Sequence, residues 1–307
     1  MDFLTSPIDW WIEPFVDNIF MRNALWSGLL AVLATSTVGT WVVLRGMSFF
    51  GEALAHGVLP GLAIAFIVGG DTTIGALIAA LVMVSGINLI RNHSPLPDDS
   101  SIGLLYVGFL ALAVVIMSSS SGAYSGDLSR FLFGSITGVT NSDLIRQLII
   151  AGITVIGIIV FHRAFLVMTF DEVQARLMGL RPQLAHAALL ALLAISIVAS
   201  FQAVGNLLVF AFLVAPPSTA AMLVRRIPYI MITAVVLGSV AVVVGLLISY
   251  HHDTAAGATM ALGTVLLFLV ALTIRSVSGA HNTLQTCLLY TSPSPRDRTR
   301  SRMPSSA

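Results

Sequence analysis

The chain has 307 residues, of which 57% are hydrophobic and only 9% charged, with a formal net charge of +1. Soluble domains carry about a quarter charged residues, so the composition excludes a water-soluble protein, argues against a nucleic-acid partner and indicates a polytopic membrane protein. All 15 basic residues are Arg and Cys287 is the single cysteine, which excludes a conventional P-loop ATPase site, a Schiff-base lysine and a cysteine-based metal cluster.

The first segment, residues 1–22, differs from everything that follows it. Acidic residues such as Glu13 and Asp17 alternate with aromatic residues such as Trp10 and Trp11. Tryptophan favours the headgroup region of a bilayer, so this segment is predicted to lie in contact with membrane lipid at the interface.

Residues 23–276 then form one transmembrane domain built from successive apolar runs. About 20 apolar residues suffice to cross a bilayer as a helix. The predicted fold class is therefore all-α, a polytopic integral membrane protein with eight to nine transmembrane helices, since two of the runs are short and rich in Gly. The runs cover residues 23–44, 53–70, 73–90, 102–121, 144–162, 184–203, 206–224, 229–250 and 255–274.

The arginines orient these runs. With nine spans and the N-terminus outside, eight arginines fall on the cytoplasmic side: Arg45, Arg91, Arg163, Arg176, Arg181, Arg225, Arg226 and Arg275. Those on the outside are Arg22, Arg130 and Arg146. This asymmetry follows the positive-inside rule and predicts that residues 170–182 face the cytoplasm.

The second run contains an ionisable pair. Glu52 and His56 are four residues apart, so on a helix they share one face, and a carboxylate oxygen with an imidazole nitrogen suits a divalent cation such as Zn²⁺ or Mn²⁺. Pro60 removes the backbone N–H that would bond the His56 carbonyl, so a helix break is expected there. A polar station on a translocation path and a self-neutralising pair at a helix interface both remain open on spacing alone.

Tyr250 is followed by three potential metal ligands, His251, His252 and Asp253, between the last two runs. They could contact a metal at the pore entrance, although consecutive side chains diverge. Asp253 could alternatively cap the final helix.

Pro216 and Pro217 lie in the middle of the seventh run. Two prolines at this depth predict a helix break, either a structural kink or a break that lines the path, with nearby Ser or Thr hydroxyls bonding the freed carbonyls.

Residues 170–182 predict a short helix with a defined start and stop. Asp171 is suited to the N-cap, Glu172 favours the positive end of the helix, and Arg176 belongs to the same segment. Gly179 can end the helix. At about two turns it is too short to span, so it is expected to lie on the membrane or to dock into a partner.

The C-terminal tail, residues 277–307, has another composition. Four of the 15 arginines fall within residues 288–307, which resemble translated adapter sequence and carry no functional argument here.

These elements occur together, in this order, in the permease subunits of metal-importing ABC transporters, the zinc, manganese and iron chelate family. Residues 44–61 resemble the second-helix motif of that family, and residues 132–136 resemble its Leu-Phe-Gly segment. Residues 204–220 resemble its Val-Gly-x-Leu-Leu-Val stretch with the following prolines, and residues 249–257 resemble its Ser-Tyr-x-x-Asp turn.

The resemblance implies a multi-pass permease of the bacterial cytoplasmic (inner) membrane that imports a divalent metal ion, Zn²⁺, Mn²⁺ or Fe²⁺, and holds no permanently bound cofactor. It implies a paired permease, formed as a homodimer or with a second permease, two cytoplasmic ATPase subunits and an extracytoplasmic metal-binding protein. Glu52 and His56 fall on the pair that meets the ion in transit, and residues 170–182 fall on the segment that couples to the ATPase. Glu52 stands where the family usually has Asp, which leaves the identity of the ion open.

Two alternatives remain. One is an ABC permease for cobalamin or a siderophore, and the other is a secondary ion carrier that works without an ATPase. None of these readings makes the chain itself an enzyme.

Overall fold

The computed structural model describes residues 7–94, 98–119 and 138–290, and within these ranges it contains helices and no strand. The helices are α1 Pro7–Asp17, α2 Ile19–Leu44, α3 Ser48–Gly57, α4 Leu59–Val68, α5 Thr72–His93, α6 Asp98–Ser119, α8 Asn141–Phe170, α9 Glu172–Leu177, α10 Pro182–Val204, α11 Asn206–Leu223, α12 Ile227–His252 and α13 Ala256–Tyr290.

Seven helical segments in the described ranges are long and apolar enough to cross a bilayer. They are Ile19–Leu44, Ser48–Val68, Ser100–Ser119, Asn141–Phe170, Pro182–Phe201, Ile227–His252 and Ala256–Val277. Two shorter apolar segments, Thr72–Ile87 and Leu207–Leu223, coincide with the third and seventh predicted runs. The chain is therefore an all-helical, multi-pass membrane protein, and the count of eight to nine spans stays a prediction.

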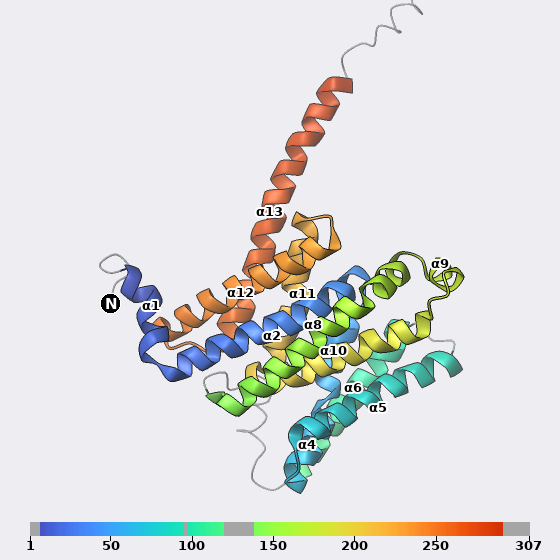
Figure 1. Cartoon of the computed structure of the whole chain (residues 1–307), viewed down its shortest axis with the longest axis vertical. Helices are drawn as coiled ribbons and strands as arrows, with labels where there is room; N and C mark the ends of the chain where they lie inside the picture. Colours follow the sequence, from blue (N-terminus) through green and yellow to red (C-terminus); the bar gives the residue numbers. More distant parts are fainter. Residues whose placement is uncertain (1–6, 95–97, 120–137, 291–307) are drawn as a thin grey trace, which may run out of the picture.

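Helix α2 lies at the centre of the larger helix group and packs against α8, α10, α11 and α12 (Figure 1). Small residues allow these close contacts. Gly28 packs against the side chain of Val242, and Gly238 of α12 packs against Val32. Helices in lipid associate through tight packing rather than through hydrophobic burial, so these glycines stabilise the α2–α12 contact.

A second group consists of α3, α4, α5 and α6, which pack mainly on one another. Figure 1 shows α4, α5 and α6 together on one side of α10. The group contacts the larger one mainly through α10 and α11, which pack on α5 and α3. Helix α3, which carries Glu52 and His56, therefore lies where the two groups meet.

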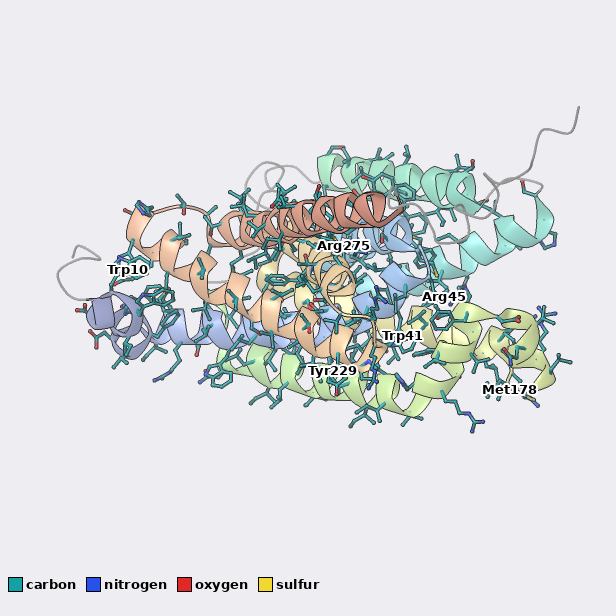
Figure 2. The ribbon with its side chains drawn as sticks, turned by 90° about the horizontal axis from the view of Figure 1, so that it is seen from above. Trp10, Trp41, Arg45, Met178, Tyr229 and Arg275 are labelled. Carbon is teal, nitrogen blue, oxygen red and sulfur yellow. The ribbon has the colours of Figure 1, made fainter. Side chains whose placement is uncertain are left out.

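The two ends of the molecule are held by polar contacts between helices. At one end the Asn23 side-chain amide donates to the Val139 carbonyl at 3.2 Å, which holds the start of α2 beside the start of α8. At the other end the Arg45 guanidinium donates to Nδ1 of His186 at 3.1 Å. Figure 2 shows Trp10 at one end and Met178 at the other.

Helix α13 is longer than the last predicted run. It continues to Tyr290, past residue 277, where the sequence analysis placed the start of the tail. Its 35 residues correspond to about 52 Å at 1.5 Å per residue, more than the ~30 Å hydrocarbon core. Residues 291–307, most of the segment that resembles adapter sequence, lie outside the described residues.

Candidate functional site

The candidate site begins with a sharp turn after α2. Gly46 adopts φ +68°, a left-handed conformation that favours glycine. The Gly46 and Met47 N–H groups donate to the carbonyls of Val43 and Val42 at 3.0 and 2.9 Å. These bonds end α2 and return the chain into α3, so the polar pair re-enters the helix bundle directly after the turn.

Glu52 and His56 both lie on α3 and are both half-buried. Tyr106 of α6 lies edge-on to the His56 ring, with 5.4 Å between ring centroids, and edge-on to Phe49 at 6.3 Å. Phe49, Glu52 and His56 follow helical spacing, so they form one stripe, and two of its three members contact the same α6 side chain. The sequence analysis did not identify Tyr106 as a site residue, because no local sequence pattern distinguishes it.

The ligand set within this chain is small. Among the described residues, no three His, Cys, Asp or Glu side chains gather closely enough to hold a metal ion. Glu52 and His56 therefore offer two donors on a partly open face, which is too few for a closed four-ligand structural site.

The helix is interrupted directly after this pair. Helix α3 ends at Gly57 and α4 begins at Leu59, so Pro60 is the second residue of a new helix. Gly57 packs against the Met83 side chain, and Gly61 packs backbone to backbone against Gly75 of α5. The missing side chains let α5 approach the interruption closely.

The second predicted break does not occur. Helix α11 runs without interruption through Pro216 and Pro217, so the expected path-lining break was wrong, and the alternative of a structural kink stays a prediction. Pro216 cannot bond the Phe212 carbonyl, but the hydroxyl of Ser36 on α2 donates to that oxygen at 3.0 Å. Pro217 likewise frees the Leu213 carbonyl, which lies against Gly39 of α2. A neighbouring helix satisfies or accommodates both freed carbonyls, which is why the helix continues.

The His251-His252-Asp253 group lies at the C-terminal end of α12. The His251 ring stacks on Trp10 of α1 with 4.4 Å between centroids, and its Nε2 lies 3.3 Å from the Trp10 carbonyl, which can only accept a hydrogen bond. Asp253 adopts φ +50° and ends the helix, and both it and His252 are exposed. His251 is thus turned toward α1, and the three side chains do not gather on one point.

The short helix predicted within residues 170–182 is α9, Glu172–Leu177. Asp171 is its N-cap and accepts from the backbone N–H groups of Val173 and Gln174 at 2.8 and 3.0 Å. At its C-terminal end, Gly179 adopts φ +75° and donates to the carbonyl of Arg176 at 3.1 Å. The caps hold a helix of six residues, fewer than two turns, at the end of the molecule that Met178 marks in Figure 2.

The sequence profile of the ABC 3 transport family matches residues 17–275. The chain belongs to the ABC 3 transport family. This membership confirms the resemblance to permease subunits of metal-type ABC transporters, and members of that kind carry no ATPase site of their own.

Several relatives match over most of their length. The chain is 33% identical to the manganese transport system membrane protein MntC of Listeria monocytogenes over 260 residues, covering 85% of this chain and 92% of the relative. It is 34% identical to the chelated iron transport system membrane protein YfeD of Yersinia pestis, covering 85% and 86%. The solved structure of PsaBC from Streptococcus pneumoniae in complex with Fab matches with a TM-score of 0.78 and 32% identity, covering 85% and 94%.

Within this ABC 3 permease, the motif at residues 132–136 falls outside the described residues. The second-helix motif instead coincides with the turn, the Glu52–His56 face and the interruption at Val58. The structure thus brings the pair and the break together, while the roles of the two side chains remain predictions.

Proposed function

We propose that this chain is the permease subunit of an ATP-driven importer that carries a divalent transition-metal ion across the bacterial cytoplasmic membrane. The observation that carries the proposal is the half-buried Glu52–His56 face of α3, placed beside a helix interruption within a membrane span. Placing an ionisable side chain within a membrane span costs free energy. A pair of such side chains on a partly open face is better suited to binding an ion in transit than to a purely structural contact.

The donor types restrict the ion. A carboxylate with an imidazole suits Mn²⁺, Fe²⁺ or Zn²⁺, whereas Mg²⁺ and Ca²⁺ prefer oxygen alone. The names of two relatives give manganese and chelated iron. We therefore propose Mn²⁺ or Fe²⁺ as the transported ion. Zn²⁺ is the third candidate, and competition in an uptake assay distinguishes it from the other two.

A second permease copy would complete the path. Two donors leave a metal ion with open positions, and the α3 face that carries them is only half-buried in one chain. Pairing with an identical or related permease would cover this face and add ligands without a permanent site.

The cytoplasmic ATPase would dock at α9. Apolar side chains here are unusually exposed, with Phe170 at 74%, Val173 at 66% and Leu177 at 83% exposure, although the turn is too short to enter the bilayer. Ala175 on the same helix is 1% exposed, so this side of α9 is packed against the rest of the protein. An exposed apolar ridge on an anchored turn fits a groove in a partner, which would supply the ATP hydrolysis that this lysine-free chain lacks.

The extracytoplasmic metal-binding protein would approach the opposite end of the molecule. His252 and Asp253 are exposed there and could contact the ion as it is handed over, whereas His251 is engaged by Trp10.

The decisive experiment measures ⁵⁴Mn²⁺ uptake into vesicles that contain this chain with its ATPase partner. Glu52→Gln keeps the size of the side chain but removes its charge, and should lower the initial rate by at least about 100-fold, more than the loss typical of an outer-shell group. The matched control is Glu13→Gln, which alters an exposed carboxylate on α1 and should leave uptake unchanged. Equal uptake by the wild type and Glu52→Gln would refute the metal path.

The same vesicles separate the alternatives. Robust uptake without ATPase and nucleotide would indicate a secondary carrier, and ATP-dependent uptake of cobalamin or a siderophore with no metal uptake would indicate the other ABC class. Unlabelled Zn²⁺ and Fe²⁺ as competitors then rank the three ions.

The docking role of α9 has its own test. Arg176→Glu should weaken co-purification of the ATPase without changing membrane insertion, because it reverses a charge on the exposed turn. Arg22→Glu makes the same change at the opposite end and should leave co-purification intact. Equal recovery of ATPase with both variants would refute docking at α9.

A further inference from the structure

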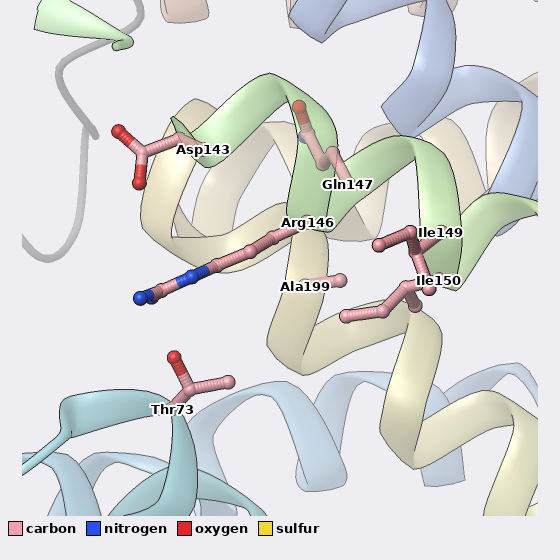
Figure 3. Close-up of a pocket in the computed structure, with 7 residues that line it drawn as sticks. All are labelled: Thr73, Asp143, Arg146, Gln147, Ile149, Ile150 and Ala199. Atoms are coloured by element: carbon pink, nitrogen blue, oxygen red, sulfur yellow. The ribbon is translucent and has the colours of Figure 1, made fainter. Parts of the chain in front are cut away.

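A cavity of about 190 Å³ lies between α5 and α8 and is floored by α10. Both α5 and α8 pack on α10, so it separates them at this point. The lining is mostly apolar and includes Ile149, Ile150 and Ala199, with Arg146 and Thr73 at its polar side. Figure 3 shows the Arg146 side chain extending between Asp143 and Thr73, away from the two isoleucines.

The cavity lies at a membrane boundary. Helix α8 has 30 residues and is about 45 Å long, so about 7 Å extends beyond a 30 Å hydrocarbon core at each end. Arg146 is the sixth residue of the helix, about 8 Å from its start by the same rise per residue. With α8 centred on the hydrocarbon core, the Arg146 guanidinium lies at the level where lipid phosphates meet the acyl chains.

Two polar side chains of the cavity lining, Arg146 and Gln147, have no hydrogen-bond partner among the described residues. Among the described residues, Arg146 makes no hydrogen bond and no ion pair. Gln147 is 4% exposed, lines the same cavity, and neither its amide nitrogen nor its oxygen has a partner there. A buried amide without a partner is costly, so this pair of residues points to a missing ligand.

Two carboxylates lie near the guanidinium, Asp143 in the cavity lining and Asp71 before α5, and neither forms an ion pair with it among the described residues. Asp143 accepts from the Thr140 hydroxyl at 2.6 Å and from its N–H at 3.1 Å. Asp71 caps α5, and the hydrogen bond from the Thr73 N–H, with a smaller contribution from Arg146, holds the pKa of that carboxyl below its usual value. The donors of the Arg146 guanidinium are therefore not taken up by either carboxylate and remain available to an anion.

The surroundings favour an anion that carries apolar chains. Ile149, which lines the cavity, is 57% exposed, and Ile153, one turn further along α8, is 50% exposed. We propose that this cavity binds one phospholipid, with the phosphate on Arg146, the glycerol ester region near Gln147 and the acyl chains along the exposed face of α8. Arginine suits a phosphate because its planar donors reach two oxygens at once. This inference rests on the membrane fold and is independent of the transported ion.

The test uses the full chain reconstituted in vesicles of phosphatidylethanolamine and phosphatidylglycerol (3:1), then extracted in mild detergent for native mass spectrometry. The wild type should retain one phospholipid per chain. Arg146→Gln should lower the retained fraction at least about tenfold. Arg22→Gln removes an exposed arginine at the same end and should retain the lipid as the wild type does.

A second variant probes the cavity without removing the charge. Ala199→Phe fills the floor from α10 and should also lose the lipid, and thermal unfolding of each variant shows that it is folded. Retention by both Arg146→Gln and Ala199→Phe would overturn the proposal. Displacement of the lipid by millimolar inorganic phosphate alone would show a free-anion site and overturn it too. Arg146→Gln that keeps its lipid but loses capture by the extracytoplasmic metal-binding protein would assign the arginine to protein docking and overturn the lipid site.

Discussion

Two membrane segments of this permease contain proline, and only one of them is interrupted. Between α3 and α4 the helix stops at Gly57, and Pro60 belongs to the next helix. In α11 two consecutive prolines lie inside one continuous helix. Ser36 and Gly39 on α2 satisfy and accommodate the two carbonyls that those prolines free.

The difference shows that proline alone does not decide whether a buried helix breaks. A freed carbonyl in lipid needs a donor or a close neighbour, and α2 supplies both to α11. At the α3–α4 interruption the close neighbours are instead glycine contacts with α5, at Gly61 and Gly75. The interrupted segment is also the one that carries the ionisable pair, and its interruption is the single residue Val58, which keeps right-handed helical backbone angles.

The largest expected loss of stability comes from adding a side chain at Gly39, where α2 and α11 are in close contact. Gly39→Val would drive a side chain into the Leu213 backbone, which cannot move without bending α11, so we expect a loss of more than about 3 kcal/mol and little folded protein. Gly152→Val is the control, because no atom lies within 4 Å of a Cβ added there. Yield and chemical unfolding in mixed micelles measure both. Equal stability of the two variants would mean that α2 does not support the proline segment.

A double-mutant cycle tests the hydroxyl. Ser36→Ala leaves the Phe212 carbonyl without its donor and should cost about 1 kcal/mol of unfolding free energy. Pro216→Ala restores a backbone N–H to that carbonyl, so Ser36→Ala should cost less than about 0.5 kcal/mol in that background. The same cost in both backgrounds would show that the Ser36 bond does not compensate for the proline.

The smallest effect is expected at the interruption itself. Pro60→Ala changes the second residue of α4, where proline is compatible with helix geometry, so the loss should stay within about 1 kcal/mol and reflect the unfolded chain. Chemical unfolding measures the change in the free energy of unfolding, and metal uptake shows whether the variant still transports the ion. A clear gain in stability would instead mean that Pro60 holds the two helices apart against their tendency to join.

The sequence predicted more of the helices than of their contacts. Within the described residues, eight of the nine predicted runs each fall on one helix and the run 53–70 falls on α3 and α4, because long apolar segments can only satisfy their backbone internally in lipid. The α9 caps were also predicted, since Asp171 and Gly179 act on their own local backbone. Tyr106 and Ser36 were missed, because each acts on a residue of another helix and has no local signature.

For the candidate site, the sequence by itself determined the shared face of Glu52 and His56, since helical spacing is a property of the chain. It also identified the membrane environment, the missing ATPase site and the family, from composition and ordered motifs. Only the tertiary structure decided that Tyr106 contacts His56, that His251 turns toward Trp10, and that α11 stays whole across its prolines. These outcomes depend on which helix lies beside which, and packing between distant segments is set by the whole bundle rather than by any local pattern.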